Sequence, residues 1–259
     1  MNVLAAFTFI VPVLTWSASC VAQVDTLQIY TPQTQVEASA EQSQLSNGTP
    51  HWYAQSLRIA RKTSPRELGE LTLTQTRRFG LDDHQISGLY VLPLTNKLTA
   101  TLGAGLSPSH RVLAKHSLDA SLQYQLQPTW LVHAGLSNRR YSKTTVNQAS
   151  LTLEHYFSNF SLAGTWKPAR ALGVGASSAD LRGTYYYGNA NLIGVIVSSG
   201  REAVTIDAST VVLADVRGAA LVGRHWLSSH WALKYALSNQ RQGRFYNRQS
   251  VHLGAEFIF

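Results

Sequence analysis

Cysteine is almost missing from this chain. The single cysteine, Cys20, allows no disulfide within the chain and no cysteine-ligated metal site. For an exported protein, stability would then have to come from something other than covalent cross-links.

Charged residues and long hydrophobic runs are also scarce. Asp, Glu, Lys and Arg make up 14% of the 259 residues, against about 25% in an average soluble domain. The mean hydropathy is −0.08, which is too low for a helical membrane protein. After residue 22, no segment offers the ~18 consecutive apolar residues of a transmembrane helix. This combination is typical of a chain in which apolar and small polar residues alternate.

The first 22 residues differ from the rest because they carry no charge and have an apolar middle. With small residues at Ala18 and Ala22, they predict a secretory signal peptide, residues 1–22, cleaved after Ala22. The positive charge that usually opens such a segment is missing. The alternatives are a transmembrane anchor and a lipoprotein site at Cys20, where Ser17 stands in place of a larger aliphatic residue.

Strict alternation of apolar and polar residues runs through the remainder of the chain. It is clear in LDASLQYQL (118–126), ASLTLE (149–154), WALKYALS (231–238) and the closing residues 251–259. This period of two predicts β-strands, and no stretch shows the apolar spacing of an amphipathic helix. The predicted strands cover residues 33–46, 51–63, 68–79, 83–92, 97–106, 115–126, 129–138, 144–157, 159–167, 179–188, 191–199, 211–227, 230–239 and 248–259.

The predicted connections alternate between short and long. Short Pro, Asn, Gly and Ser turns such as 93–96 and 127–128 alternate with longer basic stretches such as 107–115, 168–178 and 239–248. Tight turns on one side and longer loops on the other are typical of outer-membrane barrels.

We therefore predict an all-β fold, a transmembrane antiparallel up-and-down β-barrel of about 14 strands that occupies residues 23–259. Twelve strands are the alternative if 33–63 is less regular. Lipid offers no hydrogen bonds to the backbone, so the sheet must close on itself, with both termini on the periplasmic side.

A soluble β-sandwich alternates as well, but aromatic residues near the strand ends favour the membrane, where they form interfacial girdles. These aromatics are Trp52, Tyr53, Tyr90, Tyr124, Trp130, Tyr156, Phe157, Phe160, Trp166, Tyr185, Tyr186, Tyr187, Trp226, Trp231 and Tyr246.

The last strand has an apolar face that includes Leu253, Phe257 and Phe259. This face is expected to meet lipid. The terminal phenylalanine resembles the C-terminal signature of outer-membrane proteins, which predicts recognition by the barrel-assembly machinery.

Ten charged residues fall on predicted lumen positions, where opposite signs should pair because a lone buried charge is costly. They are Arg58, Glu70, Arg78, Asp119, Glu154, Arg182, Asp215, Arg217, Lys234 and Glu256. Eight strands fill a barrel with side chains and about sixteen leave a channel. A conducting lumen and a plugged one therefore both remain open.

Basic residues gather on the predicted extracellular ends, in keeping with a net charge of +8. They are Arg111, Lys115, Arg139, Arg140, Lys143, Arg170, Arg241, Arg244 and Arg248. Such a rim attracts phosphate or carboxylate groups. Lipopolysaccharide phosphates are the first expectation and an acidic polysaccharide is the alternative. No nucleic-acid recognition fold is present.

The sequence contains no recognisable catalytic motif and no strong metal-binding motif. Asp82, Asp83 and His84 lie at a loop edge and can hold a cation at most weakly, and no other spacing matches a metal-ligand motif. No Gly-x-Ser-x-Gly motif occurs. We therefore expect no enzyme activity, no metal and no cofactor.

The stretch from Ala104 to Trp166 resembles the YaiO family of outer-membrane β-barrel proteins. The resemblance is carried by the DASL strand at 119–122, by Gly135 followed by RRYSK at 139–143, and by the closing strand. It implies an outer-membrane location and a barrel fold. Members of that family are often linked to surface-polysaccharide systems, which implies a surface polysaccharide, or its synthesis and export proteins, as partners.

The expected function is transport or secretion support through a narrow polar lumen with a basic mouth, with a surface polysaccharide as the candidate cargo. The alternative is a non-conducting barrel whose loops bind lipopolysaccharide, glycans or partner proteins.

Overall fold

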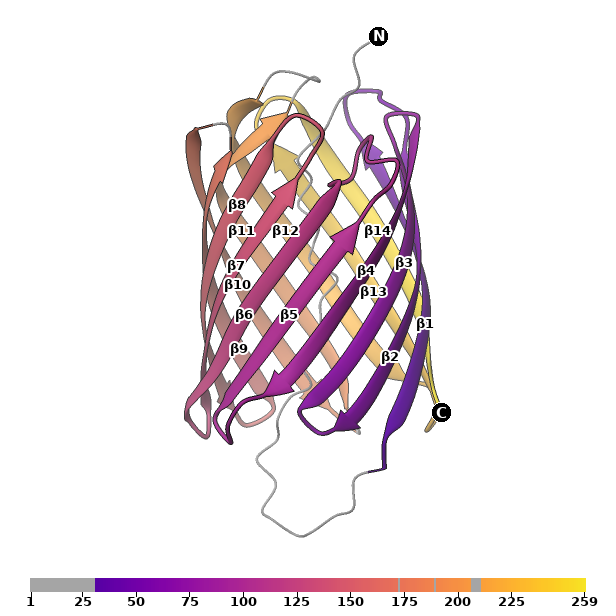
Figure 1. The fold of residues 1–259 in the computed structure, drawn as a ribbon, viewed down its shortest axis with the longest axis vertical. Coiled ribbons are helices and arrows are strands. Elements are labelled where there is room, and N and C mark those ends of the chain that lie inside the picture. The colour runs from indigo at the N-terminus through magenta and orange to yellow at the C-terminus, as the bar shows by residue number, and fades with distance from the viewer. Residues whose placement is uncertain (1–30, 172, 189, 206–210) are drawn as a thin grey trace.

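The computed structural model describes residues 31–171, 173–188, 190–205 and 211–259. The predicted signal peptide lies outside these residues. The described chain is all β (Figure 1), and none of it forms a helix long and apolar enough to cross a membrane. The strands are β1 (Gln33–Leu45), β2 (Trp52–Ser64), β3 (Glu67–Arg78), β4 (Leu81–Pro93), β5 (Leu98–Leu106), β6 (His116–Gln127), β7 (Trp130–Arg140), β8 (Thr145–Phe157), β9 (Phe160–Ala171), β10 (Val174–Tyr187), β11 (Asn191–Thr205), β12 (Val211–Trp226), β13 (Trp231–Gln242) and β14 (Tyr246–Ile258).

Every strand pairs antiparallel with its neighbours in sequence, and β1 pairs with β14 to close a barrel of 14 strands. The predicted fold and strand number are confirmed, and the alternative of twelve strands is wrong. The strands run obliquely to the long axis of the barrel (Figure 1), as closure requires. We call the end where β1 begins and β14 ends the terminal end, and the opposite end, which carries the 107–115 connection, the loop end.

The connections at the loop end are shorter than predicted. The 168–178 stretch is mostly strand, because β9 runs to Ala171 and β10 begins at Val174. Likewise, β13 and β14 take up most of 239–248. Antiparallel strands gain backbone hydrogen bonds as long as both continue, so polar sequence at their ends extends the hairpins beyond the apolar band. Among the connections that the structure describes, 107–115 remains the longest.

Side chains alternate between an apolar outer face and a polar lumen. Leu102, Leu136 and Leu253 are among many large apolar residues that are exposed on the outer wall, by 60%, 69% and 54%. The lumenal face carries small and polar residues such as Ser121 of β6 and Ser250 of β14. This inside-out arrangement matches a barrel wall that faces hydrocarbon.

Aromatic rings form a belt on the outer wall near the terminal end. From β7 to β13, consecutive ring centroids lie between 4.1 and 5.8 Å apart. The residues of this aromatic belt are Trp130, His155, Phe157, Phe160, Tyr185, Tyr187, His225 and Tyr235. The Tyr235 ring lies over Gly223, where an added Cβ would come within 2.3 Å of it. The belt therefore depends on glycine at that position.

Some predicted interfacial aromatics instead face the lumen. At the loop end, Trp52 packs with Leu45, Phe79 and Tyr246, and its ring centroid lies 5.0 Å from that of Phe79. We call these four residues the mouth cluster. It puts apolar bulk inside the lumen at the loop end.

Candidate functional site

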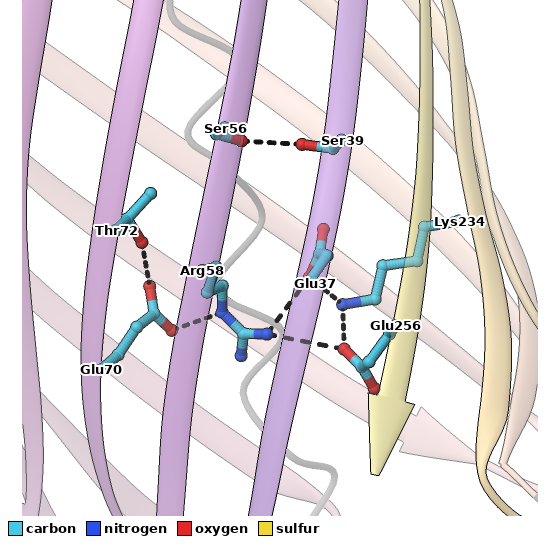
Figure 2. A network of polar contacts seen from close by, with 8 residues as sticks. All are labelled: Glu37, Ser39, Ser56, Arg58, Glu70, Thr72, Lys234 and Glu256. Atoms are coloured by element: carbon cyan, nitrogen blue, oxygen red, sulfur yellow. Dashed lines mark hydrogen bonds and ion pairs between the residues drawn. The ribbon is translucent and has the colours of Figure 1, made fainter.

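The largest group of interacting charges in the lumen lies across the seam where β1 meets β14 (Figure 2). We call Glu37, Arg58, Glu70, Lys234 and Glu256 the seam cluster. The Arg58 guanidinium donates to Glu70 at 2.7 Å and to Glu37 at 3.1 Å, and it lies 3.5 Å from Glu256. Lys234 donates to Glu37 at 2.7 Å and also to Glu256. Five strands, from β13 through β14 and β1 to β3, thus share one network.

The seam cluster resolves an unfavourable placement of like charges. Glu37 and Glu256 are directly opposite each other in the β1–β14 register, and like charges at such positions repel. Both are nearly buried, with side-chain exposures of 9% and 3%, so the repulsion would act in a low dielectric. Lys234 and Arg58 each contact both carboxylates and cancel it. Arg224 on β12 also interacts electrostatically with Glu256.

A second cluster lies on the other side of the ring. Arg182 of β10 donates to Glu154 of β8 at 3.1 Å, and His133 of β7 lies 3.6 Å from the same carboxylate. The stacked rings of Tyr156 and Tyr186 stand beside it in the lumen, 6.3 Å apart. We call these five residues the far-wall cluster.

Two further ion pairs bind neighbouring strands together nearer the loop end. Asp119 accepts from Arg139 at 3.2 Å between β6 and β7. Lys167 and Asp180 pair between β9 and β10. Each pair satisfies its charges locally along the wall.

The 107–115 connection is fixed by one carboxylate. Asp83, which is fully buried, accepts hydrogen bonds from the backbone N–H groups of Arg111, Val112 and Leu113 at 3.0, 2.6 and 2.7 Å. Val112 and Leu113 are themselves buried. The connection therefore folds inward over the loop end instead of extending into solvent.

Tyr141, in the 141–144 connection, is buried beside this region. Burial raises the pKa of its phenol, so it remains a neutral group at physiological pH.

Two arginines lie over the Trp52 ring in the mouth cluster. The guanidinium carbons of Arg78 and Arg248 are 5.3 and 5.7 Å from the ring centroid. Cation–π contact on a desolvated ring stabilises such an arrangement. Predicted as an extracellular rim residue, Arg248 instead faces the lumen. The reason is that β14 begins at Tyr246, earlier than expected.

The structure places most of the predicted lumen charges on the lumenal face. This holds for Arg58, Glu70, Arg78, Asp119, Glu154, Arg182, Lys234 and Glu256. The prediction was wrong for Asp215 and Arg217, which point outward from β12; the Asp215 side chain is 74% exposed and pairs with Arg201 at 3.2 Å. The lumenal face of β12 carries Val216 and Val222, so hydropathy did not distinguish its two faces.

The predicted rim residues separate into three groups. Arg111, Lys115, Lys143 and Arg244 lie in connections at the loop end. Arg140, Arg170 and Arg241 lie on strands and point outward into solvent or lipid. Arg139, like Arg248, was assigned to the rim wrongly, because it faces the lumen and pairs with Asp119.

The predicted lumen charges omitted Glu37 of the seam cluster, and also His133, Lys167 and Asp180. Reading β1 with a period of two puts Glu37 on the same face as Ser39 and Ser43, and that polar face was the available signal. The Asp82–His84 stretch does not converge on a cation, because Asp83 faces inward and its two neighbours face outward. Among the described residues, no three His, Cys, Asp or Glu side chains are grouped to hold a metal ion.

The C-terminal residues lie where the sequence indicated. Leu253 and Phe259 are 54% and 70% exposed on the outer wall, and the Phe257 ring lies 4.7 Å from that of Phe259. Recognition of this strand by the assembly machinery stays a prediction.

Comparison with solved structures returns membrane barrels at low sequence identity. The CymD monoaromatic hydrocarbon channel aligns with a TM-score of 0.57 at 11% identity, covering 98% of this chain and 94% of that one. A loop-deletion mutant of OmpT, an outer membrane protein of Vibrio cholerae, gives 0.53 at 9%, covering 88% and 99%. The translocator domain of the autotransporter NalP from Neisseria meningitidis gives 0.51 at 12%, covering 94% and 92%. These likenesses describe the fold alone.

Comparison of sequences identifies the family, which the structural likenesses do not. No curated protein matches the chain. The family model of the YaiO membrane beta barrel domain matches residues 33–205, which include β1 to β11.

Proposed function

This chain belongs to the YaiO membrane β-barrel family, and on that premise we propose that it passes polar solutes across the outer membrane. The export signal predicted at residues 1–22 supports that location. An even number of strands leaves both ends of the barrel domain on one side, which we assign to the periplasm. The loop end then faces the cell exterior.

The observation that carries the proposal is how the lumenal charges pair. The ion pairs of the seam cluster, of the far-wall cluster and of the two pairs nearer the loop end each join strands that are adjacent or one strand apart around the ring. The charges of the seam and far-wall clusters therefore pair along their own walls, and none of these pairs bridges the lumen. A plug of salt bridges would require pairs that cross it. Polar walls whose charges are satisfied along the wall favour a narrow passage.

Conductance in planar bilayers tests this proposal. The wild-type protein is expected to give small stepwise currents, because the 107–115 connection narrows the loop end. Asp83→Asn weakens the three charge-assisted backbone hydrogen bonds that hold this connection, so its currents should be larger or noisier. Asp82→Asn is the matched control. Asp82 is the neighbour of Asp83 in sequence but faces outward, so removal of its charge should leave the currents unchanged.

Among polar solutes, we propose a surface polysaccharide as the cargo. In the far-wall cluster, the stacked Tyr156 and Tyr186 rings stand beside the Glu154–Arg182 pair. An aromatic face next to hydrogen-bonding charges is suited to a sugar chain. Oligosaccharide fragments of the surface glycan should then block the current reversibly, and less so in Tyr156→Ala.

A non-conducting interaction barrel is the second candidate, favoured by the mouth cluster and the buried segment 112–114 at the loop end. A variant with residues 109–113 replaced by two glycines distinguishes the two. Current from this variant supports a passage. Silence from folded wild-type and shortened protein alike supports the interaction barrel.

A further inference from the structure

A group of arginines lies on the outer wall at the loop end of β11–β13. Arg201, Arg217 and Arg241 all point outward and are exposed, and we call them the arginine patch. Arg201 is paired with Asp215 at 3.2 Å. Arg217 and Arg241 have no carboxylate partner among the residues that the structure describes.

Arg217 and Arg241 are directly opposite each other in the β12–β13 register. Side chains at such positions have Cβ atoms about 5 Å apart, and like charges there destabilise the sheet. Two guanidinium groups held side by side also form a fork for a single phosphate, which accepts several charge-assisted hydrogen bonds. An anion between them turns an unfavourable contact into a favourable one.

The wall below the patch becomes apolar within a short distance. A shallow groove there is lined by the outward apolar side chains of Val195, Ala219, Leu221, Leu237 and Val251, and also by the polar side chains of Asn239, Gln249, Gln42 and Gln44. Leu221 lies four residues from Arg217, which is about 13 Å along a strand at ~3.3 Å per residue. The small Ala219 leaves room between the larger side chains. An apolar groove directly below a cationic patch fits an amphipathic anion better than a free one.

We propose that this face of the barrel binds a phosphorylated, acylated glycolipid, with a phosphate between Arg217 and Arg241 and an acyl chain in the groove. This is the chemistry of the lipid part of lipopolysaccharide. The inference rests on the proposed outer-membrane location with the loop end outward. It does not depend on whether the lumen conducts.

Native mass spectrometry of the detergent-purified full chain tests the site with bis-phosphorylated lipid A as the probe. Arg217→Gln/Arg241→Gln is expected to weaken binding about tenfold or more, the loss of one to two charge-assisted hydrogen bonds. Arg140→Gln/Arg170→Gln is the matched control, because it removes two outward arginines of the loop end that are not opposite each other. Equal loss in both double variants would contradict a defined site, as would no loss in either. Both double variants change only outer-wall residues, and heat-modifiable migration in gels confirms that each is folded.

Two further probes distinguish the glycolipid from its components. Lipid A stripped of phosphate should bind at least about tenfold more weakly than the intact form, and equal binding would overturn the role of the arginines. Millimolar inorganic phosphate should fail to displace intact lipid A, because the groove also contributes. Complete displacement would overturn the glycolipid assignment and leave a simple phosphate site. A groove-filling Ala219→Trp variant should also lower binding of intact lipid A, and unchanged binding would contradict the acyl-chain position.

Discussion

Two pairs of like charges face each other across neighbouring strands, one inside the barrel wall and one outside. Inside, Glu37 lies opposite Glu256 across the β1–β14 seam. Outside, Arg217 lies opposite Arg241 between β12 and β13. The chain supplies cations of its own to the inner pair, whereas among the described residues no carboxylate serves the outer pair.

The difference follows from what surrounds each pair. In the seam cluster, the carboxylates are buried, so neither salt nor water can compensate for their repulsion, and an internal counter-charge is required. The outer pair meets headgroups and electrolyte, which can supply an anion and screen the charges. A barrel can therefore leave charge unpaired on its outer wall only where its surroundings provide the counter-charge.

The largest expected effect comes from removing the inner counter-charge. Lys234→Met leaves Glu37 and Glu256 opposed with Arg58 and Arg224 to compensate, so the free energy of unfolding should fall by about 3 kcal/mol or more. Denaturant unfolding of the lipid-folded protein, followed by tryptophan fluorescence, measures this loss. Lys97→Met, at an exposed turn residue, is the control and should have little effect. A similar loss in both variants would contradict the importance of the seam cluster.

A second substitution should recover part of that loss. In the Lys234→Met background, Glu256→Gln removes one of the two opposed charges, so about 1–2 kcal/mol of stability should return. The same substitution in the wild-type chain should destabilise it, because Lys234 and Arg58 then lose an acceptor. A Glu256→Gln effect of the same sign in both backgrounds would show that the carboxylates do not repel.

The outer pair should respond in the opposite way to a charge change. Arg217→Glu places a carboxylate opposite the Arg241 guanidinium, so in lipid-free detergent the unfolding free energy should rise by about 0.2–1 kcal/mol. The melting point of the heat-modifiable form reports this change. Lower stability in Arg217→Glu would mean that the two arginines do not repel in the wild-type protein.

Salt should produce the smallest effect, and of the two opposed pairs it should act only on the exposed outer one. Between about 0.01 M and 1 M salt the Debye length falls from about 30 to 3 Å, which relieves repulsion between exposed arginines. The wild-type barrel in detergent should gain a few tenths of a kcal/mol, about the size of an exposed charge interaction, and Arg217→Glu should not gain. An equal gain in both proteins would assign the salt response to other charges.

The sequence predicted the barrel well because the alternation of apolar and polar residues recurs in most of the strands. A period of two put Arg58 and Lys234 on the lumenal face, and lipid requires closure whatever the side chains are. The loop-end turns were predicted less well. Polar sequence such as 168–178 reads as loop, although backbone pairing extends the strands through it.

The candidate sites were less predictable because they depend on register between strands distant in sequence. Glu37 and Glu256 become opposed only when the ends of the barrel domain pair. Arg217 was assigned to the lumen because β12 carries apolar residues on both faces, including Val216 and Leu221. Pairing with Arg241 follows from the β12–β13 register, which composition does not reveal.

The most direct test measures the melting points of wild-type and Arg217→Glu barrels, each in detergent alone and with bis-phosphorylated lipid A. We expect the order to reverse. Without the glycolipid, Arg217→Glu should be the more stable protein, and with it the wild type should be, because only the wild type has two arginines for the phosphate. The same order in both conditions would contradict the view that the outer pair is completed by its surroundings.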